Sequence, residues 1–373
     1  MALSKIGTPG LESSISTNLT GTVNGFTPTV SNMAGRNKII NGAMVFDQRN
    51  AGASYTQVNG VYSLDRWSGN SFDGGAAYNK YSVQQSTTAP AGFSNSLLVT
   101  SLAATADSGN DIFNIEQKIE GFNSADLAFG TASAKTITLS FWVRSSLTGT
   151  FGGAIKNSAR DRAYPFAYTI SSANTFEYKT ITIAGDTSGT WVGSTNGMGL
   201  WLSFGLGVSS SRSNTAGAWA GGDLFSSTGA VRVIGTSGAT FYITGVQLEE
   251  GSVATPFEHR QYGTELQLCK RYFEIWKYES GVGIDRYRAG SGWTDSIVFN
   301  MEVQKRAAPT IAIGGSAEIR DGSNAAKTIS FADSNSQVIR LGVPAAQAPL
   351  TYSVGTIRFA SGVGDFVSMS AEL

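Results

Sequence analysis

The stretch ITLSFWVR, residues 137–144, decides the fold class. Its apolar residues alternate with residues of another kind, which is the period of a β-strand that lays one face on a core. One parity holds Ile137, Leu139, Phe141 and Val143, and the other holds Thr138, Ser140, Trp142 and Arg144. We therefore expect a half-buried strand here.

The same alternation recurs along the chain. GLWLSFGLGV (199–208) places Leu200, Leu202, Phe204, Leu206 and Val208 on one parity, and DIFNIEQKIEG (111–121) places Phe113, Ile115, Gln117 and Ile119 on one. Clusters such as DSGND (107–111) and GDTSGT (185–190) have the composition of turns. Many short strands joined by such turns predict an all-β protein, most economically a jelly-roll β-sandwich.

The composition excludes several classes of partner. Lys and Arg together number 27, and Asp and Glu also number 27, so the overall charge does not predict binding to nucleic acid. No apolar run approaches the roughly 18 residues that cross a bilayer, and we expect no membrane insertion. The N-terminus lacks the apolar core of a signal peptide. We expect synthesis in a cytoplasm and export, if any, inside an assembled particle.

Four segments divide the chain. Residues 1–36 are rich in Ser, Thr, Gly and Asn and follow no strand or helix period, so we expect an extended arm held by another chain or lying on its own domain. Residues 37–260 form the predicted jelly roll, residues 261–271 a connector helix, and residues 272–373 a smaller C-terminal β-sandwich. SIVFNMEVQ (296–304) and FVSMSAEL (366–373) supply strand alternation in the last segment.

The stretch TFYITGVQLEEG (240–251) closes the predicted jelly roll. Its apolar parity changes at Gly245, which predicts a β-bulge there, and Pro256 marks the end of the strand. Thr264 and Gln267 then have the spacing of a capping box at the start of the connector helix. Leu266 and Cys269 lie on one face of that helix, with Cys269 as a small apolar residue.

The same region holds residues that resemble an active site. Glu249 and Glu250 are adjacent, and His259 is the one histidine of the chain. Adjacent residues of a strand point to opposite faces, so the two carboxylates cannot flank one bond. Scattered carboxylates such as Asp65, Asp161 and Asp223 could serve a glycosidase only if the fold pairs them. We expect a protein that is not an enzyme.

A metal site has one weak candidate. A single cysteine and a single histidine exclude the usual zinc and iron sites. Asp107, Asn110 and Asp111 could offer oxygen ligands to calcium, but the remainder of a calcium-loop motif is missing. A plain turn is the alternative, and we expect no cofactor.

Two tryptophans indicate a binding face. Trp142 and Trp201 occupy the non-core parity of their strands, beside Ser140, Thr138 and Ser203. A flat aromatic ring among hydroxyl groups is what stacking against a sugar ring requires. The alternative is that a loop, a second domain or another subunit covers both tryptophans.

The motifs resemble those of tail-fibre and appendage proteins of marine and cyanobacterial tailed phages. The resemblance lies in MALSKIGTPGL (1–11), RNKIINGAMVFDQRN (36–50), LDRW (64–67), TGVQLEEGSVATPFEHRQYGTELQLCKRYF (244–273), KRAAPT (305–310) and the terminal AEL (371–373). Residues 150–235 match only in style. No long shaft or heptad repeat precedes the jelly roll, which speaks against a long free-standing fibre.

The resemblance implies a virion structural protein with a jelly roll like that of carbohydrate-binding modules. Such proteins are often homotrimers, attached to other virion proteins through the arm, here residues 1–36, with the far part facing a host-surface glycan. Three readings follow: a tail fibre or similar appendage, a capsid head fibre or decoration (cement) protein, and a spike enzyme that degrades polysaccharide.

Overall fold

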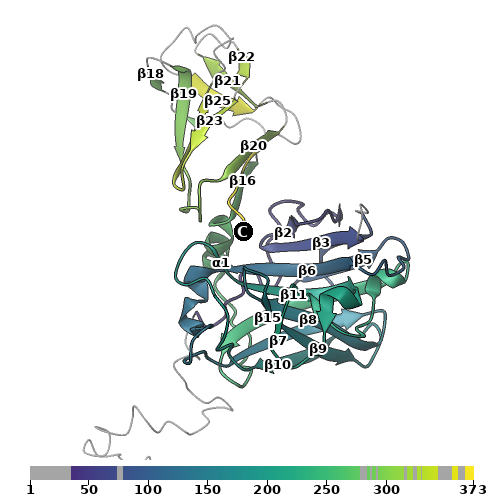
Figure 1. Cartoon of the computed structure of the whole chain (residues 1–373). Coiled ribbons are helices and arrows are strands. Elements are labelled where there is room, and N and C mark those ends of the chain that lie inside the picture. The colour runs from purple at the N-terminus through teal and green to yellow at the C-terminus, as the bar shows by residue number, and fades with distance from the viewer. Residues whose placement is uncertain are drawn as a thin grey trace, which may run out of the picture.

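The computed structural model describes residues 35–73, 79–277, 284–285, 288–290, 293–314, 317–321, 326–328, 330–342, 355–359 and 366–373. The predicted arm, residues 1–36, lies outside these residues except for its last two positions. Within them the chain is built almost entirely from antiparallel strands, with a large lower lobe and a smaller upper one (Figure 1). The prediction of an all-β fold is confirmed.

The large lobe consists of two sheets. The six-stranded sheet has the order β1 (Tyr55–Thr56), β4 (Tyr81–Ser86), β5 (Ser96–Ser101), β15 (Thr240–Glu250), β7 (Ile137–Ser145), β10 (Glu177–Ile183). The seven-stranded sheet has the order β13 (Ala220–Gly221), β9 (Arg162–Ile170), β8 (Gly149–Lys156), β11 (Met198–Val208), β6 (Asp111–Glu120), β3 (Trp67–Asp73), β2 (Val61–Leu64). Because β5, β6 and β7 alternate between the sheets, the chain winds as a jelly roll does.

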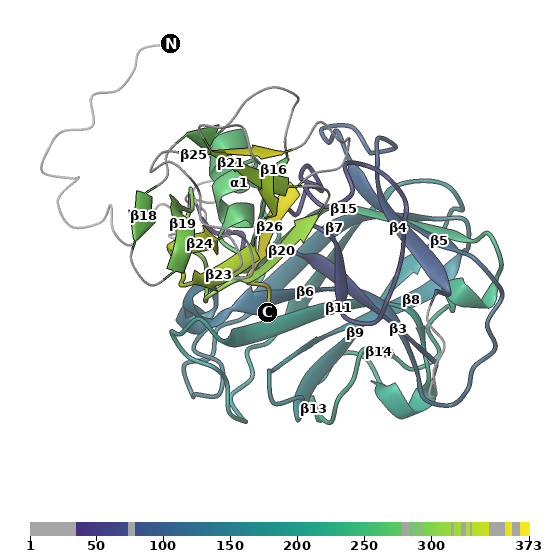
Figure 2. The same ribbon diagram turned by 90° about the horizontal axis from the view of Figure 1, so that it is seen from above.

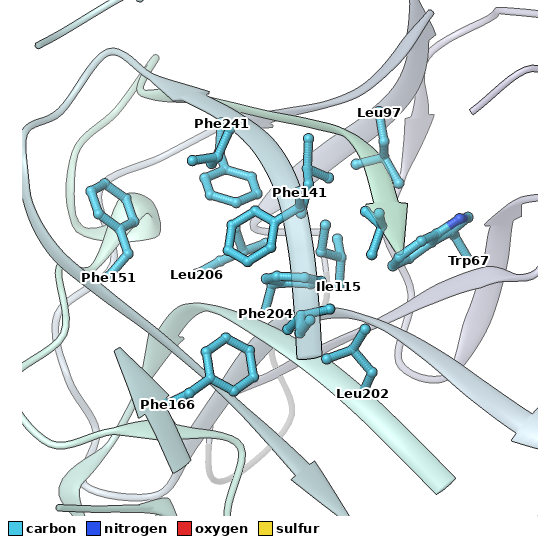
Figure 3. Close-up of a cluster of buried hydrophobic side chains, with 14 of the residues drawn as sticks. Trp67, Leu97, Ile115, Phe141, Phe151, Phe166, Leu202, Phe204, Leu206 and Phe241 are labelled. Carbon is cyan, nitrogen blue, oxygen red and sulfur yellow. The ribbon is translucent and has the colours of Figure 1, made fainter. Parts of the chain in front are cut away.

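The core lies between these two sheets (Figure 3). Phe141 of β7 and Phe204 of β11 are fully buried, and their ring centroids lie 5.0 Å apart in an edge-to-face arrangement. Phe166 packs edge-on against Phe204 from the other side, at 5.9 Å. The apolar parity of both predicted strands therefore faces inward, as the alternation requires.

The predicted bulge at Gly245 is confirmed. The pairing of β15 with β7 shifts register between Thr244 and Gln247, and Gly245 has φ +61°. The extra residue lets both Ile243 and Leu248 face the core despite their opposite parity. The strand itself ends at Glu250, six residues before the proline that was expected to mark its end.

The first described residues run beside the end of β15. The Lys38 amide donates to the Leu248 carbonyl at 2.8 Å, and the Asn37 amide donates to the Glu258 carboxylate at 2.9 Å. Arg260 donates to the Ile39 carbonyl at 3.0 Å. The chain therefore enters the large lobe next to the point where it leaves that lobe.

The connector helix α1 spans Tyr262–Lys270, close to its predicted range. Its first backbone bond runs from the Glu265 amide to the Gln261 carbonyl, so Thr264 lies inside the helix. The predicted capping box is therefore wrong, and Gln261 at the N-cap makes no side-chain cap bond. Contacts of the Glu265 carboxylate with Arg260 and with the Asn41 amide hold this first turn instead. Cys269 is buried in an apolar cluster with Ile40, Phe46 and Tyr272, as expected for its face.

The upper lobe contains three smaller sheets (Figures 1 and 2). They are β16 (Phe273–Lys277), β26 (Phe366–Ser370), β20 (Thr310–Gly314); β17 (Ile284–Asp285), β25 (Gly355–Phe359), β21 (Ala317–Asp321), β22 (Ala326–Thr328); and β18 (Arg288–Gly290), β19 (Trp293–Asn300), β24 (Val338–Gly342), β23 (Ser330–Ser334). β12 (Ser213–Asn214) pairs with β14 (Ser226–Ser227) in the large lobe. Independent folding of residues 37–260 and 272–373 remains a prediction.

Short 3-10 helices join some of these strands. They are η3 (Gly121–Asn123), η4 (Ala125–Leu127), η5 (Ser210–Arg212) and η6 (Val233–Gly235). Among the residues described above, no helix combines the length and the apolar character that crossing a membrane would take.

Candidate functional site

Trp142 lies on the outer face of the six-stranded sheet, where the pairing of three strands builds a row of side chains. Its Cα partners are Tyr178 on β10 and Thr244 on β15. The Trp142 and Tyr178 ring centroids are 5.4 Å apart and their planes are tilted by 47°. Trp142 is half-buried and Tyr178 is 44% exposed, so this aromatic pair keeps an open side toward solvent.

A second row lies beside the first. Arg144, two residues along β7 on the same parity, pairs with Tyr242 of β15. The Arg144 guanidinium carbon lies 4.8 Å from the Tyr242 ring centroid and 5.9 Å from that of Phe176. Cation–π contacts of this kind hold the guanidinium group at a fixed place. The two rows together, Trp142, Arg144, Phe176, Tyr178, Tyr242 and Thr244, are called the Trp142 face below.

Two polar atoms of the Trp142 face have no hydrogen-bond partner among the described residues. They are Nε of Arg144 and Oγ1 of Thr244, and both are buried. Leaving a buried donor unpaired costs on the order of 1–3 kcal/mol. Most buried polar groups of folded proteins are paired, so these two atoms are exceptions on this face.

Aromatic rings continue the face toward the end of the large lobe. A Cβ atom at Gly245 would lie 2.6 Å from Cζ of Phe93 and 3.2 Å from Cδ1 of Trp142, so both rings close over the bulge. Phe93 in turn packs against Phe257 at 5.1 Å and against His259 at 5.4 Å. Glycine at the bulge is therefore needed both for its positive φ and for the approach of the two rings.

The serine and threonine that were expected beside Trp142 are buried. Ser140 and Thr138 are buried, at 2% and 1% exposed. The segment after β15 folds back over this end of the sheet: Thr138 donates to the Gly251 carbonyl at 2.8 Å and Thr182 to the Ser252 carbonyl at 3.1 Å. Ser140 is thus closed to a ligand, which corrects that expectation. On β10, Thr180 and Thr182 are exposed.

Trp201 and Ser203 do not form an open face either. Trp201 is 7% exposed, Nζ of Lys156 lies 3.7 Å from its ring centroid, and Phe225 packs edge-on at 5.7 Å. Ser203 is fully buried and donates to the Phe225 carbonyl at 2.9 Å. The expected stacking of a sugar on Trp201 is therefore corrected, because the segment that contains Phe225 occupies that surface.

The environment of Trp201 also holds a buried cation. Lys156 is fully buried and pairs with Asp223 at 2.7 Å. Burial lowers the pKa of Lys156 to about 8, and the carboxylate of Asp223 opposes this shift. The ammonium group is thus held by one ion pair and two aromatic faces, those of Trp201 and Phe225.

The candidate calcium ligands form hydrogen bonds and ion pairs with other groups of the protein. Asp111 is fully buried and pairs with Nη2 of Arg232 at 2.5 Å. Asp107 accepts from the Gly109 amide at 2.9 Å, and Oδ1 of Asn110 accepts from Nε of Arg212 at 2.9 Å. Guanidinium groups therefore contact the oxygens of Asp111 and Asn110, and the plain turn remains a prediction. No metal-binding group of three or more His, Cys, Asp or Glu is found in the described part of the chain.

The residues that resembled an active site have structural contacts. Glu249 is buried and accepts from the Thr255 amide at 2.9 Å and from Gln247 at 2.8 Å, while Glu250 pairs with Lys135 at 2.8 Å on the other face. His259 packs its ring on Phe257 at 4.9 Å. The two glutamates therefore point away from each other, as predicted from the strand parity.

The other carboxylates also have partners. Asp65 is buried and pairs with Arg49 at 2.9 Å, Asp161 accepts from Asn157 at 2.6 Å, and Asp223 holds Lys156. None of these pairings brings two of the three predicted carboxylates together.

A hollow of about 850 Å³ lies where the described chain begins, between residues 35–40 and 257–264. Phe122, Phe257 and His259 line it together with charged residues. Its charged groups already pair with one another: Glu258 lies 3.8 Å from Arg260, and Lys38 pairs with Asp126. This hollow offers no unpaired polar group comparable to those of the Trp142 face.

Sequence reasoning found Trp142 and missed the rest of the Trp142 face. The segment EYKTITI (177–183) alternates Tyr178, Thr180 and Thr182 with Ile181 and Ile183, so its outer parity carried a readable signal. The neighbouring Arg144 was visible on the same parity as Trp142. Their joining with Tyr242 and Thr244 depends on strand pairing across about 100 residues, which no local pattern reports.

The chain is similar to solved structures of phage and carbohydrate-binding proteins. The enzymatically active domain of tailspike protein 4 of bacteriophage CBA120 matches at 15% identity and TM-score 0.31, over 58% of this chain and 21% of that one. A protein of Bacteroides thetaiotaomicron, described as a putative sugar-binding protein, matches at 10% identity and TM-score 0.34, over 58% of this chain and 100% of that one. The module TmCBM61, solved with β-1,4-galactotriose, matches at 10% identity and TM-score 0.29, over 58% and 99%.

The chain thus spans 21% of the length of the tailspike domain. No protein-family model matches it. No curated protein matches it either. With TM-scores of this size, the assignment of a ligand rests on the side chains of the chain itself.

Proposed function

We propose that this protein is a glycan-binding structural subunit of a phage virion, a tail fibre or similar appendage, without catalytic activity. The observation that carries the proposal is the half-open pair of Trp142 and Tyr178, which lies on a sheet face that also bears exposed Thr180. A sugar ring presents CH groups to an aromatic face and hydroxyls to its surroundings, so such a face suits it.

Attachment to the particle belongs to residues 1–36 in this proposal, with the protein as a homotrimer exposed on the virion. The motifs that resemble phage appendage proteins support this part. The described end of the arm also supports attachment through this segment. Residues 35–38 are fixed to the large lobe by hydrogen bonds to Glu258 and Leu248, so the arm starts from a defined position.

Glycan binding is tested on a glycan array with wild type and with Trp142→Ala and Tyr178→Ala. Loss of binding in both variants, with wild-type binding in the matched control Phe122→Ala, is the expected result. Phe122 is also an exposed aromatic residue, at 56%, but it lies in η3, outside the Trp142 face. Wild-type binding in all three variants would overturn the proposal.

Two alternatives are separated by further measurements. A capsid cement protein would bind particles through residues 1–36 and bind no glycan at all, so the same array decides against it. A spike enzyme would release reducing ends from host polysaccharide, and single substitutions of Asp65, Asp161 or Asp223 would abolish the release. Deleting residues 1–36 should leave a folded protein that no longer joins particles.

A further inference from the structure

We infer that the Trp142 face selects glycans that carry a carboxylate, with the sugar ring on Trp142 and Tyr178 and the acid group on Arg144. This inference rests on the proposed function and adds the chemical class of the ligand. Its basis is a guanidinium group that the fold places beside the aromatic pair and that pairs with no carboxylate among the residues the structure describes.

Arg144 is held in place by aromatic rings instead of by acids. Its guanidinium carbon lies 4.8 Å from the Tyr242 centroid and 5.9 Å from the Phe176 centroid, and these two rings are themselves 6.1 Å apart. The side chain is half-buried. A guanidinium group fixed in this way loses little conformational freedom when it binds an anion.

The acids Glu177 and Glu249, on the two strands that pair with β7, are engaged elsewhere. Glu177 of β10 accepts from Nζ of Lys179 at 2.6 Å and from the Ser171 and Ser172 amides at 2.8 Å. Glu249 of β15 is held by Thr255 and Gln247. In the described part of the chain, no carboxylate forms an ion pair with Arg144, so its charge remains uncompensated on this face.

A ligand reaches the Trp142 face through the exposed part of the Arg144 side chain, because the two unpaired atoms of the face are themselves closed to solvent. Nε of Arg144 and Oγ1 of Thr244 are buried without partners in the described structure, and Thr244 is fully buried. Thr244 is the Cα partner of Trp142, so its hydroxyl lies on the same row as the stacking ring. A carboxylate accepts two parallel N–H bonds from a guanidinium fork, which a neutral sugar hydroxyl does not do.

The inference is tested with pairs of probes that differ only in charge. Oligogalacturonate, hyaluronate and alginate oligosaccharides are compared with their carboxyl-reduced forms, whose uronic acids have become neutral hexoses. We expect wild type to bind at least one acidic form about 10- to 100-fold more tightly than its reduced form, because hydrogen bonds to a charged group are stronger than those to a neutral hydroxyl. Binding of the acidic form should weaken as salt concentration rises.

Variants then assign the preference to Arg144. Arg144→Gln should lose the preference for the acidic probe and keep the affinity for the reduced probe, whereas Arg144→Lys should keep part of the preference. The matched control is Arg160→Gln, whose side chain is 55% exposed and lies away from this face. An equal loss for both probes in Arg144→Gln would overturn the inference, because it would indicate a merely structural role.

The outcomes separate the inference from the proposed function. Wild type that binds reduced and acidic probes equally, with loss in Trp142→Ala, would refute acid selection and leave glycan binding in place. Absence of binding to every acidic and neutral probe and to the glycan array would refute the proposed function. If Arg144→Gln does not fold, the wild-type probe pairs and Arg144→Lys still decide.

Discussion

Arg66 and Glu372 form a buried ion pair across 306 positions of sequence. The Arg66 guanidinium carbon also lies 3.6 Å from the Tyr272 ring centroid, and Arg49 bridges Asp65 and Glu372 at 2.9 Å and 3.0 Å. The Leu373 carbonyl accepts from Tyr62 of β2 at 2.9 Å, where the C label lies near β2 and β3 (Figure 1). The last residues are thereby fastened to the large lobe.

Replacing Glu372 by Gln should destabilise the protein. The substitution leaves Arg66, which is 1% exposed, without one half of its pair, and breaking a buried pair costs about 3–5 kcal/mol. Urea unfolding measures the free energy of unfolding. The control is Glu302→Gln, whose carboxylate side chain is 62% exposed and whose loss should cost about 0–1 kcal/mol. Equal effects of the two substitutions would contradict the role given to Glu372.

Asp65 should make stability depend on pH. Burial raises the pKa of Asp65 from 3.8 to about 6, and Arg49 opposes the shift. A raised pKa in the folded state means that the contribution of Asp65 is full below pH 3.8 and is lost as pH rises through about 6. The stability of Asp65→Asn relative to wild type should therefore increase between about pH 5 and pH 7.5. Urea unfolding at both values checks this, and a pH-independent difference would refute it.

The two tryptophans should differ in their effect on stability. Trp201→Ala removes a ring that is 7% exposed and should lower the free energy of unfolding by about 3–5 kcal/mol. Trp142→Ala should cost less, because part of that side chain remains in water in the folded protein. Thermal unfolding of both variants measures the difference. A larger loss for Trp142 would contradict its place on an open face.

Gly245 should tolerate no side chain. In Gly245→Ala the new residue has φ +61°, and its Cβ atom would lie 2.6 Å from the Phe93 ring. In Gly229→Ala the new residue has φ +77°, and its Cβ atom would have no atom within 4 Å. Both substitutions strain the backbone, by about 1 kcal/mol or more. The excess cost of Gly245→Ala then reports the contact of Phe93 and Trp142 over the bulge. Equal unfolding temperatures for the two variants would show that the rings move aside freely.

Calcium should not stabilise the loop at 107–111. The Arg232 guanidinium holds Asp111 there, so adding calcium or a chelator should leave the unfolding temperature unchanged. Arg232→Ala leaves the Asp111 carboxylate buried without its ion-pair partner, with hydrogen bonds from Ser108 alone on that side, and should cost about 3–5 kcal/mol. A rise of the wild-type unfolding temperature with calcium would overturn the reading of this loop as a plain turn.

Much of the fold could be predicted from local pattern. Strand periodicity identified the core faces of β7 and β11, because side chains of a strand alternate regardless of which strands pair with it. The parity change at Gly245 predicted the bulge for the same reason. The start of α1 was harder, since contacts of Glu265 with Arg260 and Asn41 replaced the capping box.

The candidate site could be predicted only in part. Trp142 and Trp201 have the same local pattern, an aromatic residue on the outer parity of an amphipathic strand. Trp201 is covered by Phe225 and Lys156, whereas Trp142 keeps an open side next to Tyr178. Periodicity states which face a side chain takes, but it does not state what lies over that face.

The sequence by itself determined the strands, their inward faces, the bulge at Gly245 and a helix near residues 261–271, because these follow from short-range sterics and burial. The tertiary structure decided which outward residues stay open. That choice depends on segments far away in the chain, such as Gly251 against Thr138 and Phe225 over Trp201. It also depends on the pairing of β7 with β15, which unites Arg144 with Tyr242 and Trp142 with Thr244. Long-range packing is cooperative, and no local stretch of sequence contains it.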